Sequence, residues 1–149
     1  MPKPQVLLDT NVILSGLVYP TGNEHRILKL AEEKRILLVL PEFILEETRN
    51  VLAKRFPAHQ VLLEAFLKRT DFTMISRDEI EPLIEPNIGR VRDRNDTPVL
   101  AAIVHSKPDY AVTGDKVLWA DLQRLKDVTD VVRVLSPRQF LELHAFRPK

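Results

Sequence analysis

Five short apolar segments, each followed by a longer amphipathic one, constrain this chain more than any other feature of its sequence. The short segments, residues 5–8, 36–40, 72–75, 110–113 and 131–135, have the usual length of buried β-strands. Helical spacing of apolar residues follows over residues 23–35, 41–55, 58–69, 96–106 and 116–126, and Ser136 with Pro137 opens a last helix. Strands that alternate with helices predict a parallel sheet covered on both faces. We therefore expect an α/β fold with three layers, α/β/α, and a parallel sheet of about five strands.

Residues 76–95 interrupt this alternation. They contain Pro82, Pro86, Gly89 and many charged side chains, a composition that is typical of a loop. The few glycines of the chain also exclude two nucleotide-binding motifs, because neither a dinucleotide-binding glycine loop nor a Walker A loop can be built from Gly16, Gly22, Gly89 and Gly114.

The length and composition indicate one folded domain over residues 1–149. The chain is 44% hydrophobic and 29% charged, as in ordinary globular proteins. No apolar segment approaches the roughly 20 residues that cross a membrane, and the N-terminus shows no signal-peptide pattern. Because cysteine is absent, disulfides and cysteine-bound zinc are excluded, and we expect a cytoplasmic location. The net charge of +1 argues against tight nucleic-acid binding through bulk charge.

Two acidic residues follow predicted strands directly. Asp9 comes after residues 6–8, and Asp115 follows residues 110–113 with one glycine between them. Ligands of open parallel sheets bind at the carboxyl ends of the strands, so both acids stand where a functional site is expected. A turn or helix-cap role is the alternative, and it suits Asp115 well. It suits Asp9 less, because a buried carboxylate must be paired or must bind a cation.

Helical spacing places two further acids. At about 100° per residue, Glu47 shares one face of its helix with Ile44, Thr48 and Val51. Glu46 points the opposite way and is expected to be a solvated surface charge. Asp96 begins the helix at residues 96–106, on the face that carries Val99, Leu100 and Ile103. A simple N-cap is the alternative for Asp96.

Together these four acids predict a cation site. Carboxylates that converge raise one another's pKa, and a hard divalent cation such as Mg²⁺ or Mn²⁺ neutralises such a cluster. A site of this kind can activate water and offset charge on a phosphodiester. The histidines show no metal-ligand spacing and receive no role: His25, His59, His105 and His144.

The ordered motifs resemble the PIN domain, and particularly the VapC-like toxins of prokaryotic toxin–antitoxin pairs. The first motif is residues 6–12, and the second is residues 41–52, with its pattern at Glu46, Glu47, Arg49, Val51 and Leu52. The third begins with Arg92, Asp93 and Asp96 and continues to residues 109–116. Residues 135–141 also resemble one branch of these proteins. The resemblance spans nearly the whole chain.

The resemblance implies a metal-dependent ribonuclease that hydrolyses phosphodiester bonds in single-stranded or structured RNA with Mg²⁺ or Mn²⁺. It implies Asp9, Glu47, Asp96 and Asp115 as the metal-site carboxylates, and it suggests that Thr10 and Asn11 orient Asp9 or the bound water. Many relatives carry another acid or Asn two or three residues after the last aspartate. Here Val117 and Leu118 stand there, so we expect a second metal ion to bind weakly or only with substrate.

Other readings fit less well. A haloacid-dehalogenase-type phosphatase needs a second aspartate at the position of Asn11, and a receiver domain needs a phospho-accepting aspartate after the strand at residues 72–75. The main alternative is a catalytically silent PIN domain that binds RNA or a partner protein. The presence of all four acids argues against it.

The expected partners are an RNA substrate, an antitoxin protein and a second copy of the chain. Two helices carry apolar residues beyond what one core-facing stripe requires: Ile27, Leu28 and Leu30, with Leu62, Leu63 and Phe66. Large apolar patches usually mark interfaces, which favours a homodimer. The alternative is that these side chains fill the core of the monomer.

Overall fold

The strands of this chain form a single parallel sheet with the first strand at its centre. We describe residues 2–143 from a computed structural model of the chain. The sheet has five strands in the order β3-β2-β1-β4-β5, and all its pairings are parallel. The strands are β1 (Gln5–Leu8), β2 (Leu37–Pro41), β3 (Phe72–Ile75), β4 (Tyr110–Val112) and β5 (Arg133–Leu135). The predicted parallel α/β fold, with residues 5–8 central, is confirmed.

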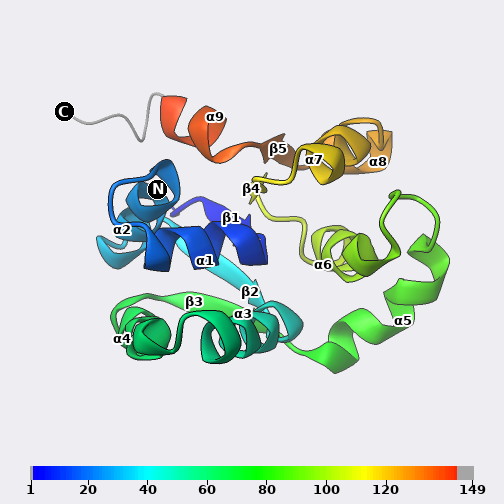
Figure 1. Cartoon of the computed structure of the whole chain (residues 1–149). Helices are drawn as coiled ribbons and strands as arrows, with labels where there is room; N and C mark the ends of the chain where they lie inside the picture. The colour runs from blue at the N-terminus through cyan, green and yellow to red at the C-terminus, as the bar shows by residue number, and fades with distance from the viewer. Residues whose placement is uncertain (1, 144–149) are drawn as a thin grey trace.

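Helices cover both faces of the sheet (Figure 1). They are α1 (Thr10–Val18), α2 (Asn23–Glu32), α3 (Glu42–Arg55), α4 (Gln60–Arg69), α5 (Arg77–Asn87), α6 (Thr97–Ser106), α7 (Lys116–Gln123), α8 (Lys126–Thr129) and α9 (Pro137–Glu142). Two short 3₁₀ turns precede α4 and α6, namely η1 (Pro57–His59) and η2 (Arg94–Asp96). One apolar core lies under α1–α4 and α9, and the other lies under α5–α8.

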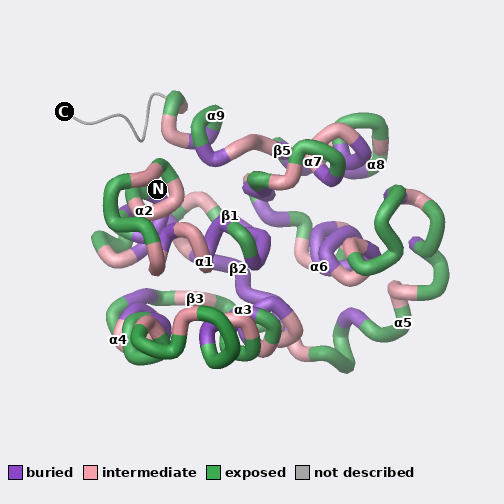
Figure 2. The backbone as a smooth tube through the Cα atoms, in the orientation of Figure 1, coloured by how far each residue is buried: buried purple, intermediate pink, exposed green. Residues whose placement is uncertain are grey.

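The central strands supply both cores because successive side chains point to opposite faces of a sheet. Val6 and Leu8 of β1 enter the core under α1–α4 and α9, whereas Leu7 enters the core under α5–α8. In Figure 2 the central strands and much of α6 are therefore drawn as buried. A strand that is buried on both faces reads as a continuous apolar run, which is how the sequence presents it.

Helix α1 was not predicted from the sequence, and it begins directly after β1. Asp9 is its N-cap, since the Asp9 carboxylate accepts a hydrogen bond from the backbone N–H of Thr10 at 2.8 Å. Gly16 lets α1 approach α2 closely, because a β-carbon there would lie 2.6 Å from Leu28 Cδ1. The chain therefore leaves the central strand and turns at once into a tightly packed helix.

The prediction of a loop over residues 76–95 was wrong, because α5 occupies its first half. Ser76 and Glu79 form a capping box, in which each side chain accepts a hydrogen bond from the backbone N–H of the other residue. Pro82 and Pro86 lie one turn apart on the exposed side of α5, where the carbonyls that they leave unpaired can reach water. The cap and the buried Ile80 thus outweigh two helix-breaking residues.

Most of the apolar side chains that suggested a dimer fill the core of the monomer. Leu62 is 41% exposed, but its five companions are buried: Ile27, Leu28, Leu30, Leu63 and Phe66. The argument for a homodimer from surplus apolar surface is therefore wrong, and this surface is limited to Leu62 and its neighbour Val61.

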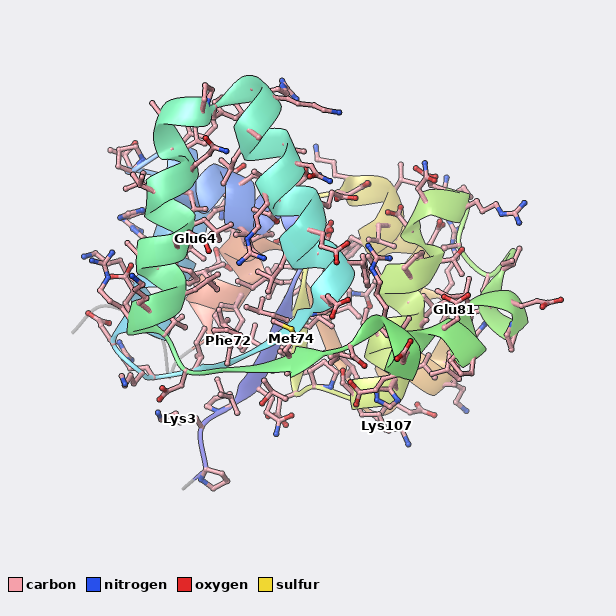
Figure 3. All side chains as sticks on the ribbon, turned by 90° about the horizontal axis from the view of Figure 1, so that it is seen from below. Lys3, Glu64, Phe72, Met74, Glu81 and Lys107 are labelled. Carbon is pink, nitrogen blue, oxygen red and sulfur yellow. The ribbon has the colours of Figure 1, made fainter. Side chains whose placement is uncertain are left out.

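The edge strand β3 exposes apolar surface of its own. Met74 is 46% exposed, and Figure 3 shows Phe72 and Met74 along this strand. Within residues 2–143, no helix is both long and apolar enough to cross a bilayer. His144, which received no role, lies outside the described residues.

Candidate active site

Two of the predicted site residues flank the point where the strand order changes direction. The chain proceeds from β1 to β2 and β3 on one side, and it returns through β4 and β5 on the other. Such a switch point leaves a crevice at the carboxyl ends of the two strands beside it. Asp9 ends β1 and Asp115 follows β4, and these strands are hydrogen-bonded neighbours. The topology therefore brings both acids to the same edge of the sheet.

Asp9 is buried and held by two hydrogen bonds. Its Oδ1 accepts from the backbone N–H of Thr10, and its Oδ2 accepts from the hydroxyl of Thr113 at 2.9 Å. Burial raises the pKa of Asp9, and the charges of Glu47 and Asp115 raise it further, while the hydrogen bonds from Thr113 and Thr10 lower it. The carboxylate is thus fixed in position in a setting that disfavours its charge.

Thr113 is a site residue that the sequence analysis missed. Its hydroxyl donates to Asp9 Oδ2, and its oxygen accepts from the backbone N–H of Asp115 at 3.1 Å. One buried side chain thus joins the ends of β1 and β4. A hydroxyl residue two positions before the strand-end aspartate was the available signal, because such side chains commonly bond backbone groups two residues away.

Asp96 carries the strongest sign of crowding among the acids. Partial burial raises its pKa to about 6, and the charges of Asp9, Asp93, Asp115 and Glu47 contribute in that order. Asp96 precedes α6 but caps it with no side-chain hydrogen bond. The simple N-cap alternative therefore does not hold, and the carboxylate faces the other acids without a partner within the described chain.

Asp115 caps helix α7 with one carboxylate oxygen and leaves the other oxygen without a hydrogen bond from the described residues. Its Oδ1 accepts from the backbone N–H groups of Val117 and Leu118 at 2.9 and 3.1 Å. The cap reading is correct for that oxygen. Oδ2 accepts no hydrogen bond from any residue that the structure describes, so it is available to a ligand.

The expectation that Glu47 faces the core was wrong, whereas Glu46 is a surface charge as expected. Ile44 and Thr48 are buried as predicted, but Glu47 is exposed. Its charge still raises the pKa of both Asp9 and Asp96, so it borders the crevice from the solvent side. Glu46 instead pairs with Arg77 of α5, which lowers the Glu46 pKa.

Thr10 and Asn11 occupy the first turn of α1. The backbone N–H of Thr10 orients Asp9, as described above, whereas its side chain is not involved in that bond. Asn11 is exposed and makes no side-chain hydrogen bond within residues 2–143. The hydroxyl that orients Asp9 belongs to Thr113 instead, and a role for Asn11 toward bound water stays a prediction.

An ion pair between exposed Arg92 and buried Asp121 anchors the segment that carries Asp96. Asp121 of α7 is 6% exposed, and its carboxylate accepts from the backbone N–H and from Nε of Arg92, both at 2.8 Å. The bond from the Arg92 backbone is the main cause that lowers the Asp121 pKa. This pair ties the loop before η2 to the helix that Asp115 caps, so it fixes the two acids relative to each other.

The carboxylates of this site suit a hard divalent cation, although those of the described residues do not form a complete coordination shell. Among residues 2–143, no three acidic or histidine side chains already have the arrangement of a metal-binding cluster. Mg²⁺ usually keeps several waters and uses only one or two protein carboxylates, so a closed cage is not required. The unpartnered oxygens of Asp96 and Asp115, beside buried Asp9, are the donor type that such ions prefer.

The fold and this acidic edge define the class of protein. A sequence model of the PIN domain family matches residues 5–117, a range that contains all four predicted acids. The chain belongs to the PIN domain family. Proteins of this family are generally nucleases, and they typically use divalent metal ions.

Two individual proteins are similar to this chain. An uncharacterised protein of Methanocaldococcus jannaschii, MJ1680, is 29% identical to this chain over 147 residues, which cover 94% of this chain and 91% of the relative. A chain in the crystal structure of VapBC2 from Rickettsia felis, bound to a DNA fragment from their promoter, matches with a TM-score of 0.65. The match covers 89% of this chain and 98% of that chain, at 14% identity. At this identity, the likeness concerns the fold.

Proposed function

We propose that this protein is a metal-dependent ribonuclease that hydrolyses phosphodiester bonds in single-stranded or structured RNA, with Asp9, Glu47, Asp96 and Asp115 as the acids that hold Mg²⁺ or Mn²⁺. The crowding of Asp96 by four other carboxylates is the observation that carries the proposal. Carboxylates whose pKa is strongly raised by burial and by like charges cluster at functional sites.

The four acids have different roles in the proposed cation site. Asp9 is the fixed donor, because Thr113 and the backbone of Thr10 hold its carboxylate. Asp96 and Asp115 offer the unpartnered oxygens, and exposed Glu47 borders the solvent side. A bound cation in such a site lowers the pKa of a coordinated water and offsets charge on the phosphate.

Cleavage assays on a panel of RNAs test the proposal. The protein with Mg²⁺ or Mn²⁺ should cleave unpaired RNA, and excess EDTA should stop cleavage. Single-stranded DNA of the same sequences measures the preference for RNA. The second candidate, a silent PIN domain that binds RNA or protein, predicts binding without turnover in either metal. Absence of metal-dependent cleavage across the panel would favour that second candidate.

We further propose that the protein acts in the cytoplasm as the toxin of a toxin–antitoxin pair. The fold that it shares with a chain of the VapBC2 structure supports an antitoxin partner. Co-expression of a small protein encoded beside it should yield a stable complex that inhibits cleavage. A homodimer stays a prediction with little surface to support it, since Val61 and Leu62 are the only large apolar side chains that α4 exposes. Light scattering at tens of micromolar protein decides between monomer and dimer.

A further inference from the structure

A hollow of about 280 Å³ adjoins the acidic edge at the carboxyl ends of β4 and β5. Thr113, Gly114 and Asp115 form the side toward the catalytic acids. Trp119 of α7, the start of α2 and the residues that open α9 form the remaining walls. A substrate whose phosphate lies at Asp115 would therefore have its neighbouring group in this hollow.

Trp119 is held in a fixed orientation in the wall of the hollow. The indole is half-buried, and its Nε1 donates to Gln139 Oε1 at 3.2 Å. Gln139 is itself fixed, because the same oxygen accepts from the backbone N–H of Ser136 at 2.9 Å. Trp119 and Gln139 also line a second hollow on the other side, over β5. Trp119 therefore packs against the core under α5–α8 and also lines a hollow on each side.

A larger hollow of about 650 Å³ lies between α2 and α9, next to the hollow at Trp119. It shares Asn23 and Arg138 with the hollow at Trp119. Arg26 and Lys29 line it, and both are exposed and form no ion pair within residues 2–143. Arg138 pairs with Glu142, but its side chain is 82% exposed, and exposed pairs of this kind are weak. Arg26 and Lys29 are therefore available to an anion, although Glu33 and Glu142 line the same hollow, and Arg138 would have to exchange Glu142 for it.

We propose that the hollow at Trp119 takes a nucleobase of the substrate RNA next to the cleaved phosphate, and that Arg138, Arg26 and Lys29 bind the phosphates beyond it. The inference rests on the proposed ribonuclease function and deepens it. An aromatic ring beside a line of cations is the usual combination for unpaired nucleic acid, since bases stack on the ring and phosphates pair with the cations. Duplex RNA keeps its bases stacked internally, so this arrangement selects unpaired segments.

The protein carries its own probe, because Trp119 is its only tryptophan. The full chain in EDTA, which prevents cleavage, is titrated with a twelve-nucleotide RNA that has no secondary structure. Stacking of a base should quench the Trp119 fluorescence, with the same Kd that anisotropy of the labelled RNA reports. Inorganic polyphosphate tests charge alone, and poly-glutamate tests an acidic protein segment as the occupant.

Each outcome decides the matter. Quenching by the RNA, but not by polyphosphate or poly-glutamate, supports the proposal. RNA that binds by anisotropy and leaves the fluorescence unchanged overturns it, as does equal quenching by polyphosphate, which shows recognition of charge only. Equal quenching by poly-glutamate overturns it in favour of a protein-binding surface. Metal-dependent cleavage without quenching rejects the base site but not the ribonuclease function. Quenching without any cleavage rejects the ribonuclease function but supports the base site.

Substitutions test the ring and the cations separately. Trp119→Leu should raise KM for RNA about tenfold with kcat little changed, whereas Trp119→Phe should retain most of the affinity. Melting temperatures identify a folding defect, and the titration of the unmodified protein does not depend on either variant. Equal KM values in all three proteins would overturn the base site.

The cationic path has a charge-matched control. The double variant Arg26→Ala and Lys29→Ala should bind RNA about tenfold more weakly at low salt, with a slope against log salt reduced by about 1.4. Lys54→Ala with Lys68→Ala removes the same charge from exposed positions of α3 and α4 and should leave binding unchanged. Equal losses in the two double variants would overturn the path.

Discussion

Substitution of Asp96 by Asn should inactivate the protein and yet make it more stable. The pKa of Asp96 is raised from 3.8 to about 6, so the folded state holds a proton that the unfolded state releases. Ionised Asp96 therefore destabilises the fold, and this loss of stability grows as the pH rises from about 4 to about 6 and is complete above pH 6. Asp96→Asn removes the charge and keeps the shape, so the variant escapes this penalty.

The magnitude follows from the size of the pKa shift. About two pKa units correspond to an upper value of about 3 kcal/mol. Because Asp96 is only partly buried, solvent screening reduces the expected gain to about 1–2 kcal/mol. For a chain of this length, such a gain raises the melting temperature by roughly 2–8 °C.

Thermal melts in EDTA at pH 7.5 and at pH 4 measure the effect. The variant should melt higher than the parent at pH 7.5, and the difference should shrink at pH 4, where Asp96 is protonated in the folded parent. Asp130→Asn, which removes an exposed carboxylate, is the control and should change stability by less than about 0.5 kcal/mol. An Asp96→Asn protein that melts lower at pH 7.5, or by a pH-independent difference, would refute the idea of crowded carboxylates.

Four further substitutions address the other contacts. Glu47→Gln should reduce cleavage by orders of magnitude, whereas Glu46→Gln, which loses only a surface ion pair with Arg77, should leave kcat/KM nearly unchanged; the reverse result would place Glu46 in the site. Thr113→Val removes a hydrogen bond that lowers the pKa of Asp9, so the acidic limb of the pH–rate profile should move to higher pH, and an unshifted limb would contradict the role of Thr113. Gly16→Ala places a β-carbon 2.6 Å from a side-chain atom of α2 and should cost about 1–3 kcal/mol in urea unfolding, and no loss would mean that α1 and α2 separate easily.

The sheet and the strand-end acids could be predicted because both depend on local patterns. Apolar runs that are buried on both faces identify β1 and β4, and the rule for parallel sheets then places Asp9 and Asp115 at one edge. The crowding around Asp96 could not be read in this way. It depends on how η2 is anchored by Arg92 and Asp121, a contact between segments far apart in the chain.

The errors have physical causes too. Pro82 and Pro86 suggested a loop, yet the capping box at Ser76 starts a helix that places both prolines toward solvent. Helical spacing assigned Glu47 to the buried side of α3. At about 100° per residue, however, a residue at the border of a buried face can be either buried or exposed, and the spacing alone does not decide which. The exposure of Glu47 depends on how α3 packs against the rest of the chain, and no pattern within one helix describes that packing.

The pairing of the first strand with the fourth has a consequence for the newly made protein. Thr113 and Asp9 are joined by a hydrogen bond across 104 positions of sequence. The chain is synthesised from its N-terminus and domains generally fold as units. A nascent chain that ends before β4 has neither Asp115 nor the hydroxyl that fixes Asp9. On the proposed ribonuclease function, a chain made in this order has no complete site during most of its own translation. The ribosome and messenger RNA that produce it would then meet the complete site only near the end of synthesis.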